Sequence, residues 1–226
     1  MINSLLNRFD NIFVFDIETT GFDPKKDEMI EIAMLHIVSK HGVPFVEDEF
    51  NAFIELTLGK TLPANIVNLT GITVEQLLKE GMPKSKICDK LTDKLSYINP
   101  LLVAFNAQFD LCFLYYFLNS FGKAGVLKNV KMLDALTIYK DRKPYPHKLS
   151  DAVQDYALET ENTHRALDDA RATFALLCAM GKESDDLERY INLFGYNPKY
   201  GVSGQKISSV KYLPQRYDSA LKLYEM

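Results

Sequence analysis

Two carboxylates close an apolar segment near the start of the sequence. In FVFDIETTGF, residues 13–22, Asp16 and Glu18 alternate with large apolar residues. An ionised carboxylate loses hydration in such surroundings, so a partner must neutralise its charge. A divalent cation is one such partner, and the pair is therefore a candidate metal site.

Further candidates occur in two later segments. Asp110 is the only charged residue between Pro100 and Lys123. In THRALDDARAT, His164 stands near a predicted helix start and is followed by Asp168 and Asp169. Adjacent residues point about 100° apart around a helix. Only one of the two aspartates is therefore expected to face the other acids.

Each residue alone has an ordinary structural explanation. Asp16 fits a turn, Asp110 fits a helix cap, and His164 fits an exposed position at a helix start. Carboxylates gathered in apolar surroundings would repel one another unless cations held them. Oxygen ligands without a cysteine cluster suit Mg²⁺ or Mn²⁺. Two such ions can promote phosphodiester hydrolysis, and a nearby histidine can accept the proton of the attacking water.

The remaining pattern predicts an α/β domain with a mixed sheet. Three strands, expected to pair antiparallel, come first, and a buried strand and helices follow. On the first strand, Ile12, Val14, Asp16 and Glu18 share one face. The predicted strands are 12–18, 29–38, 45–56 and 101–105. The predicted helices begin at the Thr73 cap, cover the apolar stripe from Ile87 to Ile98, and span 108–121, 150–158 and 163–181.

Composition limits the kind of protein this is. The 226 residues are 47% hydrophobic with a net charge of -4, which excludes coating of nucleic acid by bulk charge but permits a local basic groove. Cys88, Cys112 and Cys178 are expected to be buried thiols of a reducing compartment. The apolar run from Leu111 to Leu118 is too short to cross a bilayer. We expect a soluble, cytoplasmic protein that does not bind membranes.

Three motifs resemble those of one enzyme family. DIETTG, NAQFD and HRALDDA occur in the order found in the DEDDh exonucleases, which include the proofreading epsilon subunit of bacterial DNA polymerase III. The resemblance covers about residues 9–181 and implies an RNase H-like α/β fold, with a mixed five-stranded sheet flanked by helices. We therefore expect an exonuclease domain over 1–181 and a C-terminal appendage or tail over 182–226, which either packs on the domain or forms a partner surface.

The resemblance also implies roles for individual residues. It assigns two Mg²⁺ or Mn²⁺ ions to four acids, general-base catalysis to one histidine, and nucleotide binding to five further positions. The acids are Asp16, Glu18, Asp110 and Asp169, the base is His164, and the nucleotide-binding residues are Thr19, Thr20, Gly21, Asn106 and Phe109. Asp168 is left with a salt-bridge or solvent role. LTGIT, residues 69–73, looks like a further family feature beside the site. Many members have a histidine where this sequence has Phe105.

The implied activity is metal-dependent 3'-5' exonuclease action that releases nucleoside 5'-monophosphates from single-stranded ends. Likeness to polymerase-associated members favours DNA, with a role in proofreading or repair and a polymerase subunit as a further partner. Trimming of RNA ends is the alternative, and a non-catalytic module that binds nucleic acid or a polymerase ranks third. The segment YKDRKPYPHK, residues 139–148, is interpreted either as a phosphate cradle with Tyr139 or Tyr145 stacking on bases, or as a solvated loop.

Overall fold

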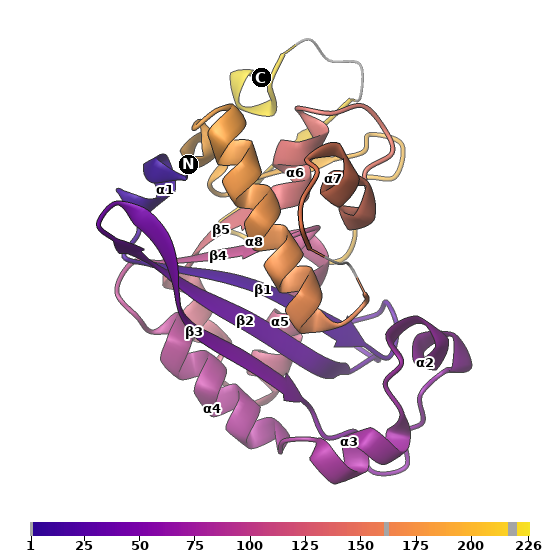
Figure 1. The fold of residues 1–226 in the computed structure, drawn as a ribbon. Coiled ribbons are helices and arrows are strands. Elements are labelled where there is room, and N and C mark those ends of the chain that lie inside the picture. Colours follow the sequence, from indigo (N-terminus) through magenta and orange to yellow (C-terminus); the bar gives the residue numbers. More distant parts are fainter. Residues whose placement is uncertain (1, 161–162, 217–220) are drawn as a thin grey trace.

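A five-stranded mixed sheet forms the centre of the molecule (Figure 1). The computed structural model describes residues 2–160, 163–216 and 221–226. The strand order is β3-β2-β1-β4-β5, with β1, β2 and β3 antiparallel and with β4 and β5 parallel to β1. The predicted fold class is therefore confirmed. The strands are β1 Asn11–Thr19, β2 Met29–Lys40, β3 Val43–Phe53, β4 Pro100–Ala104 and β5 Lys131–Asp134.

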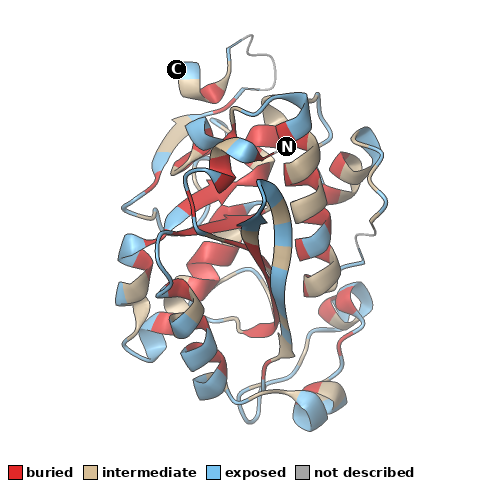
Figure 2. Ribbon diagram, turned by 60° about the vertical axis from the view of Figure 1, so that its left-hand side comes forward, coloured by how far each residue is buried: buried red, intermediate tan, exposed pale blue. Residues whose placement is uncertain are grey.

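Helices cover both faces of this sheet (Figures 1 and 2). On β1, Ile12 and Val14 pack in the core cluster that includes helix α8 (Ala166–Glu183). Phe13, Phe15 and Ile17 pack in the cluster that includes helices α4 (Lys84–Leu95) and α5 (Ala107–Ser120). Both faces of β1 are apolar because each is covered. The helices are α1 Asn3–Leu6, α2 Ala64–Thr70, α3 Val74–Glu80, α4 Lys84–Leu95, α5 Ala107–Ser120, η1 Ala124–Asn129, α6 Ala135–Lys140, α7 Leu149–Asp155 and α8 Ala166–Glu183.

Several predicted boundaries differ from the observed ones. The Thr73 cap is present, because its hydroxyl accepts from the Gln76 N–H at 3.1 Å. The helix predicted over 150–158 begins one residue earlier, at Leu149, and ends at Asp155; at its start the Asp151 carboxylate accepts from the Lys148 N–H. The third-motif helix starts after Arg165, whose backbone is extended.

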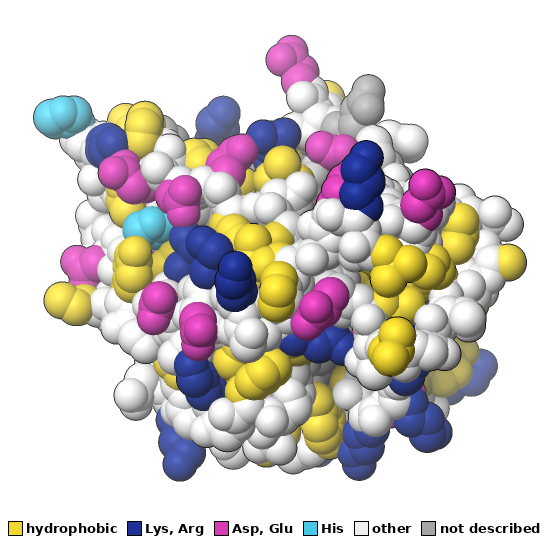
Figure 3. Space-filling model, turned by 90° about the horizontal axis from the view of Figure 1, so that it is seen from below, with side chains coloured by type: hydrophobic (Ala, Val, Ile, Leu, Met, Phe, Trp, Pro, Cys, Tyr) yellow, Lys and Arg dark blue, Asp and Glu magenta, His cyan; other side chains and the backbone are white. Residues whose placement is uncertain are grey.

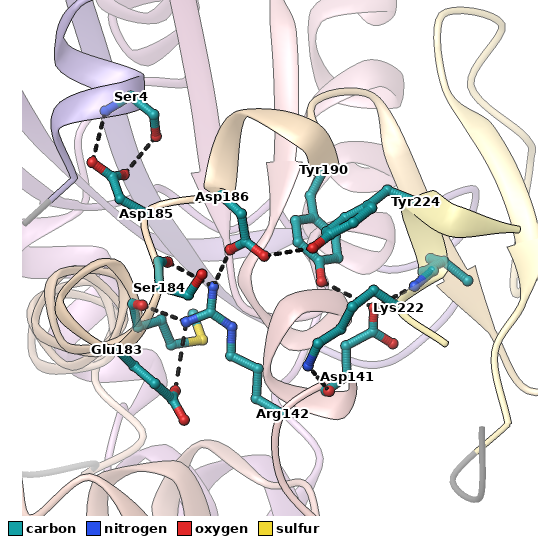
Figure 4. Close-up of polar contacts among 12 residues, drawn as sticks. Ser4, Asp141, Arg142, Glu183, Ser184, Asp185, Asp186, Tyr190, Lys222 and Tyr224 are labelled. Carbon is teal, nitrogen blue, oxygen red and sulfur yellow. Dashed lines mark hydrogen bonds and ion pairs between the residues drawn. The ribbon is translucent and has the colours of Figure 1, made fainter. Parts of the chain in front are cut away.

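The C-terminal segment lies against the rest of the chain. It contains η2 Leu187–Tyr190, β6 Leu193–Tyr196, β7 Lys211–Pro214 and η3 Leu223–Glu225, with β6 and β7 paired in parallel. Arg142 binds the Met180 and Ser184 carbonyls and the Asp186 carboxylate, and the Tyr224 hydroxyl binds Asp186 as well (Figure 4). Asp141 accepts from Tyr190 and from the backbone of Leu223. These contacts join the tail to the end of α6.

The basic segment 139–148 departs from the prediction at Tyr139 and Arg142. Tyr139 is fully buried and donates to the Asp155 carboxylate, so its expected stacking on bases is wrong. Arg142 is buried as well, because it holds the tail. Tyr145 is 73% exposed and keeps the stacking role only as a prediction.

The thiols and the helices bear on two further expectations. Cys88 and Cys112 are buried and Cys178 is partly buried, and all three are unpaired thiols. Within the described ranges, no helix has both the length and the apolar character that crossing a bilayer requires.

Candidate active site

Three acidic side chains converge where β1 ends and α8 begins. Asp16 and Glu18 lie on the face of β1 that α8 covers, and Asp169 is buried in the first turn of α8. One carboxylate oxygen from each lies within 4.8 Å of the other two. Asp168 points elsewhere, because its carboxylate accepts from the Thr163 hydroxyl at 2.6 Å. A β-bulge follows directly at Glu18/Thr19 and ends the regular pairing with β2.

Asp110 adds a fourth carboxylate from a different element. It lies in the first turn of α5 and is 3% exposed. Burial raises its pKa well above the ordinary value, and the charges of Asp134 and Asp169 act in the same direction. Hydrogen bonds from its own backbone N–H and from that of Ile17 oppose this rise. The Ile17 contact places Asp110 against the β1 residue between the two strand acids.

The acids perturb one another strongly. Burial raises the pKa of Asp16 well above its usual range, and the negative charges of Asp110, Asp169 and Glu18 add to the effect. Burial, followed by the charges of Asp169 and Glu31, raises the pKa of Glu18 to about 8. Near neutral pH the cluster therefore retains protons unless cations replace them. An all-oxygen donor set of this charge fits hard divalent cations.

His164 lies at the entrance to α8, outside the acidic cluster. It precedes the helix by two residues, has φ 56° and is exposed. A positive φ is uncommon for a residue with a Cβ. The next residue, Arg165, holds the chain at this point through its contacts with Glu31.

An ion pair fixes the start of the third motif. Glu31 of β2 is fully buried and lies opposite Glu18 in the strand register. It accepts from Arg165 Nε at 3.1 Å, from Arg165 Nη2 at 2.9 Å and from the Ala166 N–H at 3.2 Å. Sequence reasoning missed this pair. A charged residue inside the otherwise apolar segment MIEIAML was the available signal.

A second missed residue, Asp134, holds the turn of the second motif. One of its carboxylate oxygens accepts from the backbone N–H groups of Asn106, Ala107 and Leu136, and the other accepts from the Thr137 hydroxyl. Asn106 has φ 66°, a left-handed conformation that asparagine tolerates. Asp134 thus fixes the turn from which α5 and Asp110 begin.

The first-motif residues predicted to bind nucleotide fold their own loop. The Thr19 hydroxyl donates to the Gly21 carbonyl at 2.6 Å, and the Thr20 hydroxyl donates to Asp27 at 3.3 Å. A Cβ on Gly21 would lie 2.5 Å from the Asp27 carboxylate and would displace it from its contacts with the Thr20 hydroxyl and the Asp23 N–H. These contacts fix the loop that follows Glu18.

Two aromatic rings lie beside that loop. Phe22, which follows Gly21, is 82% exposed, and its ring meets that of Phe109 edge-on at 6.4 Å. Phe22 was not predicted, although an apolar residue directly after the motif was the signal. The pair offers apolar surface next to the acids.

The other family positions have structural contacts. Phe105, where many members have histidine, packs in the core with its ring 6.3 Å from that of Tyr139. In the segment 69–73, Gly71 ends α2 with φ 70°, and Ile72 packs in the small cluster that contains Ile30. This segment therefore rests on β2 one residue from Glu31.

Comparison with known proteins decides the family. The RNase_T exonuclease family profile matches residues 13–177, a range that contains all four acids and His164. The chain belongs to this exonuclease family. Residues 13–177 are thus an exonuclease domain of the DEDD type, a class of phosphodiester hydrolase.

Curated relatives support the same family. The DNA polymerase III PolC-type protein of Clostridium perfringens (strain 13 / Type A) is 37% identical over 182 residues, which cover 78% of this exonuclease and 12% of the relative. The PolC-type protein of Bacillus subtilis (strain 168) is 34% identical over 176 residues, covering 76% and 11%. The chain thus spans about an eighth of the length of these relatives.

Solved structures share the fold. The exonuclease resembles the zinc-bound form of the E. coli ExoI–ssDNA complex with a TM-score of 0.71 and 16% identity, over 80% of this chain and 42% of that one. It resembles Exonuclease I from Methylocaldum szegediense with a TM-score of 0.66 and 15% identity, over 77% and 40%. The predicted RNase H-like architecture is thereby confirmed.

Proposed function

We propose that this exonuclease removes nucleotides from the 3' end of single-stranded DNA and releases nucleoside 5'-monophosphates. The observation that carries the proposal is the convergence of Asp16, Glu18 and Asp169 within 4.8 Å, with Asp110 buried beside them. PolC-type relatives, named as DNA polymerases, and ExoI–ssDNA complexes of the same fold support DNA as the substrate.

Asp16, Glu18, Asp110 and Asp169 are the residues that would hold two Mg²⁺ or Mn²⁺ ions. When bound, the ions would withdraw negative charge from the scissile phosphate and lower the pKa of an attacking water. The acids themselves supply a fixed cradle, since each comes from a strand end or a helix start with a buried backbone. The raised pKa values of Asp16 and Glu18 support cation binding, because an ion removes the repulsion that favours their protonation.

His164 is the proposed general base, and the aromatic rings are the proposed contacts to the terminal base. His164 is exposed and one residue from Arg165, so its backbone is held while its ring can reach a bound strand. Its role is to accept the proton of the attacking water. We propose that Phe22 and Phe109, whose rings are in contact, stack on the terminal base next to the backbone of Gly21.

Digestion of 5'-labelled single strands tests the proposal. With Mg²⁺ or Mn²⁺ we expect a ladder that shortens a DNA oligonucleotide from its 3' end, and no ladder with EDTA. His164→Ala should lower kcat by about 10²–10⁴-fold. Asp169→Asn should abolish the ladder, whereas Asp168→Asn, one residue away and outside the cluster, should retain it.

Two outcomes would contradict the proposal. An equal loss of cleavage in the Asp168→Asn and Asp169→Asn variants would reject the assignment of Asp169 as a metal-binding acid. Shortening of a matched RNA oligonucleotide alone would keep the site and replace the substrate, since the chemistry of hydrolysis does not depend on the 2'-hydroxyl.

A further inference from the structure

We propose that residues 196–216 of the tail bind the single strand on the 5' side of the bond that is cut. This inference rests on the proposed function and extends it. The segment contains Lys199, Lys206, Lys211 and Arg216 and no acidic residue, in a chain of net charge -4. All four are exposed, and among the described residues none of them forms an ion pair. Their charges are therefore available to a polyanion.

The second motif holds this segment in place. Gln108 is 8% exposed, and its Nε2 donates to the carbonyls of Ser203 and Gln205, both at 2.9 Å. Its Oε1 accepts from the Tyr212 hydroxyl at 2.6 Å. Gln108 precedes Asp110 by two residues in α5, so the two side chains leave the helix on opposite flanks. Helix α5 thus carries both Asp110, which faces the acidic site, and Gln108, which binds the tail.

A polar cavity separates the tail from the second motif. Its volume is about 150 Å³, and its lining includes Asn106, Lys140, Asn197 and Ser203. This space is several times that of one water molecule. Lys140 adds a cation from α6 that forms no ion pair within the described chain. The Asp134 carboxylate also lines the cavity, but it already accepts hydrogen bonds from three backbone N–H groups and the Thr137 hydroxyl. The amide, hydroxyl and ammonium groups around the space suit a phosphate oxygen.

A turn at the tip of the segment presents an aromatic ring. The N–H groups of Tyr200 and Gly201 donate to the Asn197 carbonyl at 3.1 and 2.9 Å. Tyr200 is 74% exposed, and the Lys199 ammonium lies 5.2 Å from its ring centre. Exposed aromatic side chains among cations are typical of surfaces that stack bases and track a backbone. The ring favours a nucleic-acid strand over an acidic peptide, which would have no base to stack on it.

The rest of the tail keeps this surface rigid. Phe194 and Val210 are buried in the core cluster that contains α5, and the Asn192 side chain accepts from the Met132 N–H of β5 at 2.8 Å. At the far end of the tail, η3 is tied to the end of α6 (Figure 4). In Figure 1 the tail runs along the side of the molecule that carries α6 and α7.

The test measures binding of a 5'-labelled oligothymidylate of about 12 nucleotides by fluorescence anisotropy. An Asp16→Asn background prevents cutting, so the measurement does not depend on activity. The test variant combines Lys140→Ala, Lys199→Ala and Lys206→Ala. Its matched control combines Lys90→Ala, Lys131→Ala and Lys182→Ala, three exposed lysines elsewhere that change net charge equally. Salt is varied between about 50 and 200 mM.

For the parent, log K for the oligonucleotide should fall linearly with the logarithm of the salt concentration, with a slope of about -0.7 for each phosphate contact. Loss of three contacts should make this slope shallower by about 2 in the test variant, and the control variant should keep the slope of the parent. Tyr200→Ala should raise Kd at least about fivefold, and Tyr200→Phe should not. Equal slopes for the test and control variants would overturn the inference, because bulk charge would then explain the binding. No binding by the parent would overturn it as well. Failure of the proposed function is seen separately, as absence of cleavage by the unsubstituted chain.

Discussion

Glu18 differs from an ordinary surface glutamate in how it binds protons. Its pKa in the folded protein is about 8, mainly because it is buried, whereas 4.5 is the value of a free glutamate. Between pH 4.5 and 8 the folded protein therefore holds a proton that the unfolded chain has lost. The free energy of unfolding must fall as pH rises through this window, when no cation is bound.

The prediction is that metal-free protein melts at a lower temperature at pH 8 than at pH 5, and that Glu18→Gln reduces this difference. Thermal melts in EDTA at both pH values measure it. Glu28→Gln is the control of opposite sign. Burial raises the pKa of Glu28, but the contacts with Lys84 and Thr57 together outweigh burial and lower this pKa. Removing that carboxylate should lower the melting temperature at pH 8. A pH-independent melting temperature would contradict the electrostatic description of the cluster.

The Arg165–Glu31 pair allows a second prediction at the level of residues. Arg165→Met leaves a fully buried carboxylate with one backbone donor, which should cost about 2–3 kcal/mol of stability. Arg171→Met is the matched control, because Arg171 makes the same two-nitrogen contact with the exposed Glu49. Loss of this exposed ion pair should lower the free energy of unfolding by less than about 1 kcal/mol. Urea denaturation measures the free energy of unfolding of both variants. Similar decreases in the two variants would contradict a special role for the buried Glu31 carboxylate.

Among the elements, the turn between β4 and α5 depends on β5. Asp134→Ala removes the acceptor of three backbone N–H groups and should cost about 2 kcal/mol or more. Asp134→Asn keeps an acceptor oxygen and should cost clearly less. Because α5 carries Asp110, the alanine variant should also lower kcat on a DNA oligonucleotide. Unfolding curves and rates for both variants test this, and equal stability of the two would reject the clamp.

The sequence predicted some elements well and others poorly, for physical reasons. The run around Asp16 was identified as a central strand because it is apolar on both faces, and the structure confirms it. β5 was not identified from its pattern, since its four residues Lys131–Asp134 are too few to show a period. Glu31 and Asp134 were missed because their roles depend on partners far away in the chain.

The motifs predicted the site better than single residues did. The structure brings Asp16, Glu18 and Asp169 together and leaves Asp168 outside, as the spacing of the third motif implied. Within the segment 139–148, the predictions fail at Tyr139 and Arg142, because composition alone does not distinguish a buried side chain from a solvated one. Arg142 is held by the tail, which the three motifs do not cover.

For the whole molecule, the tail is part of the packed structure. Phe194 is 2% exposed in the cluster that contains α5, so Phe194→Ala should cost about 3–5 kcal/mol. A chain ending at residue 181 should be less stable still, because it also loses the partners of Arg142 and Asp141. Circular dichroism melts of both proteins measure this. A truncated chain as stable as the full one would show that 1–181 folds independently.

The order in which the acid-bearing strand and helices follow along the chain has a consequence for its synthesis. Asp16 lies near the beginning of the sequence, Asp110 near the middle and Asp169 in a helix that forms only after most residues have been made. Chains are synthesised from the N-terminus at about 5–20 residues per second. A ribosome that stops before α8 is complete thus leaves a fragment with part of the sheet and an incomplete set of acids. On the proposed assignment of the acids, such unfinished copies are expected not to cut nucleic acid.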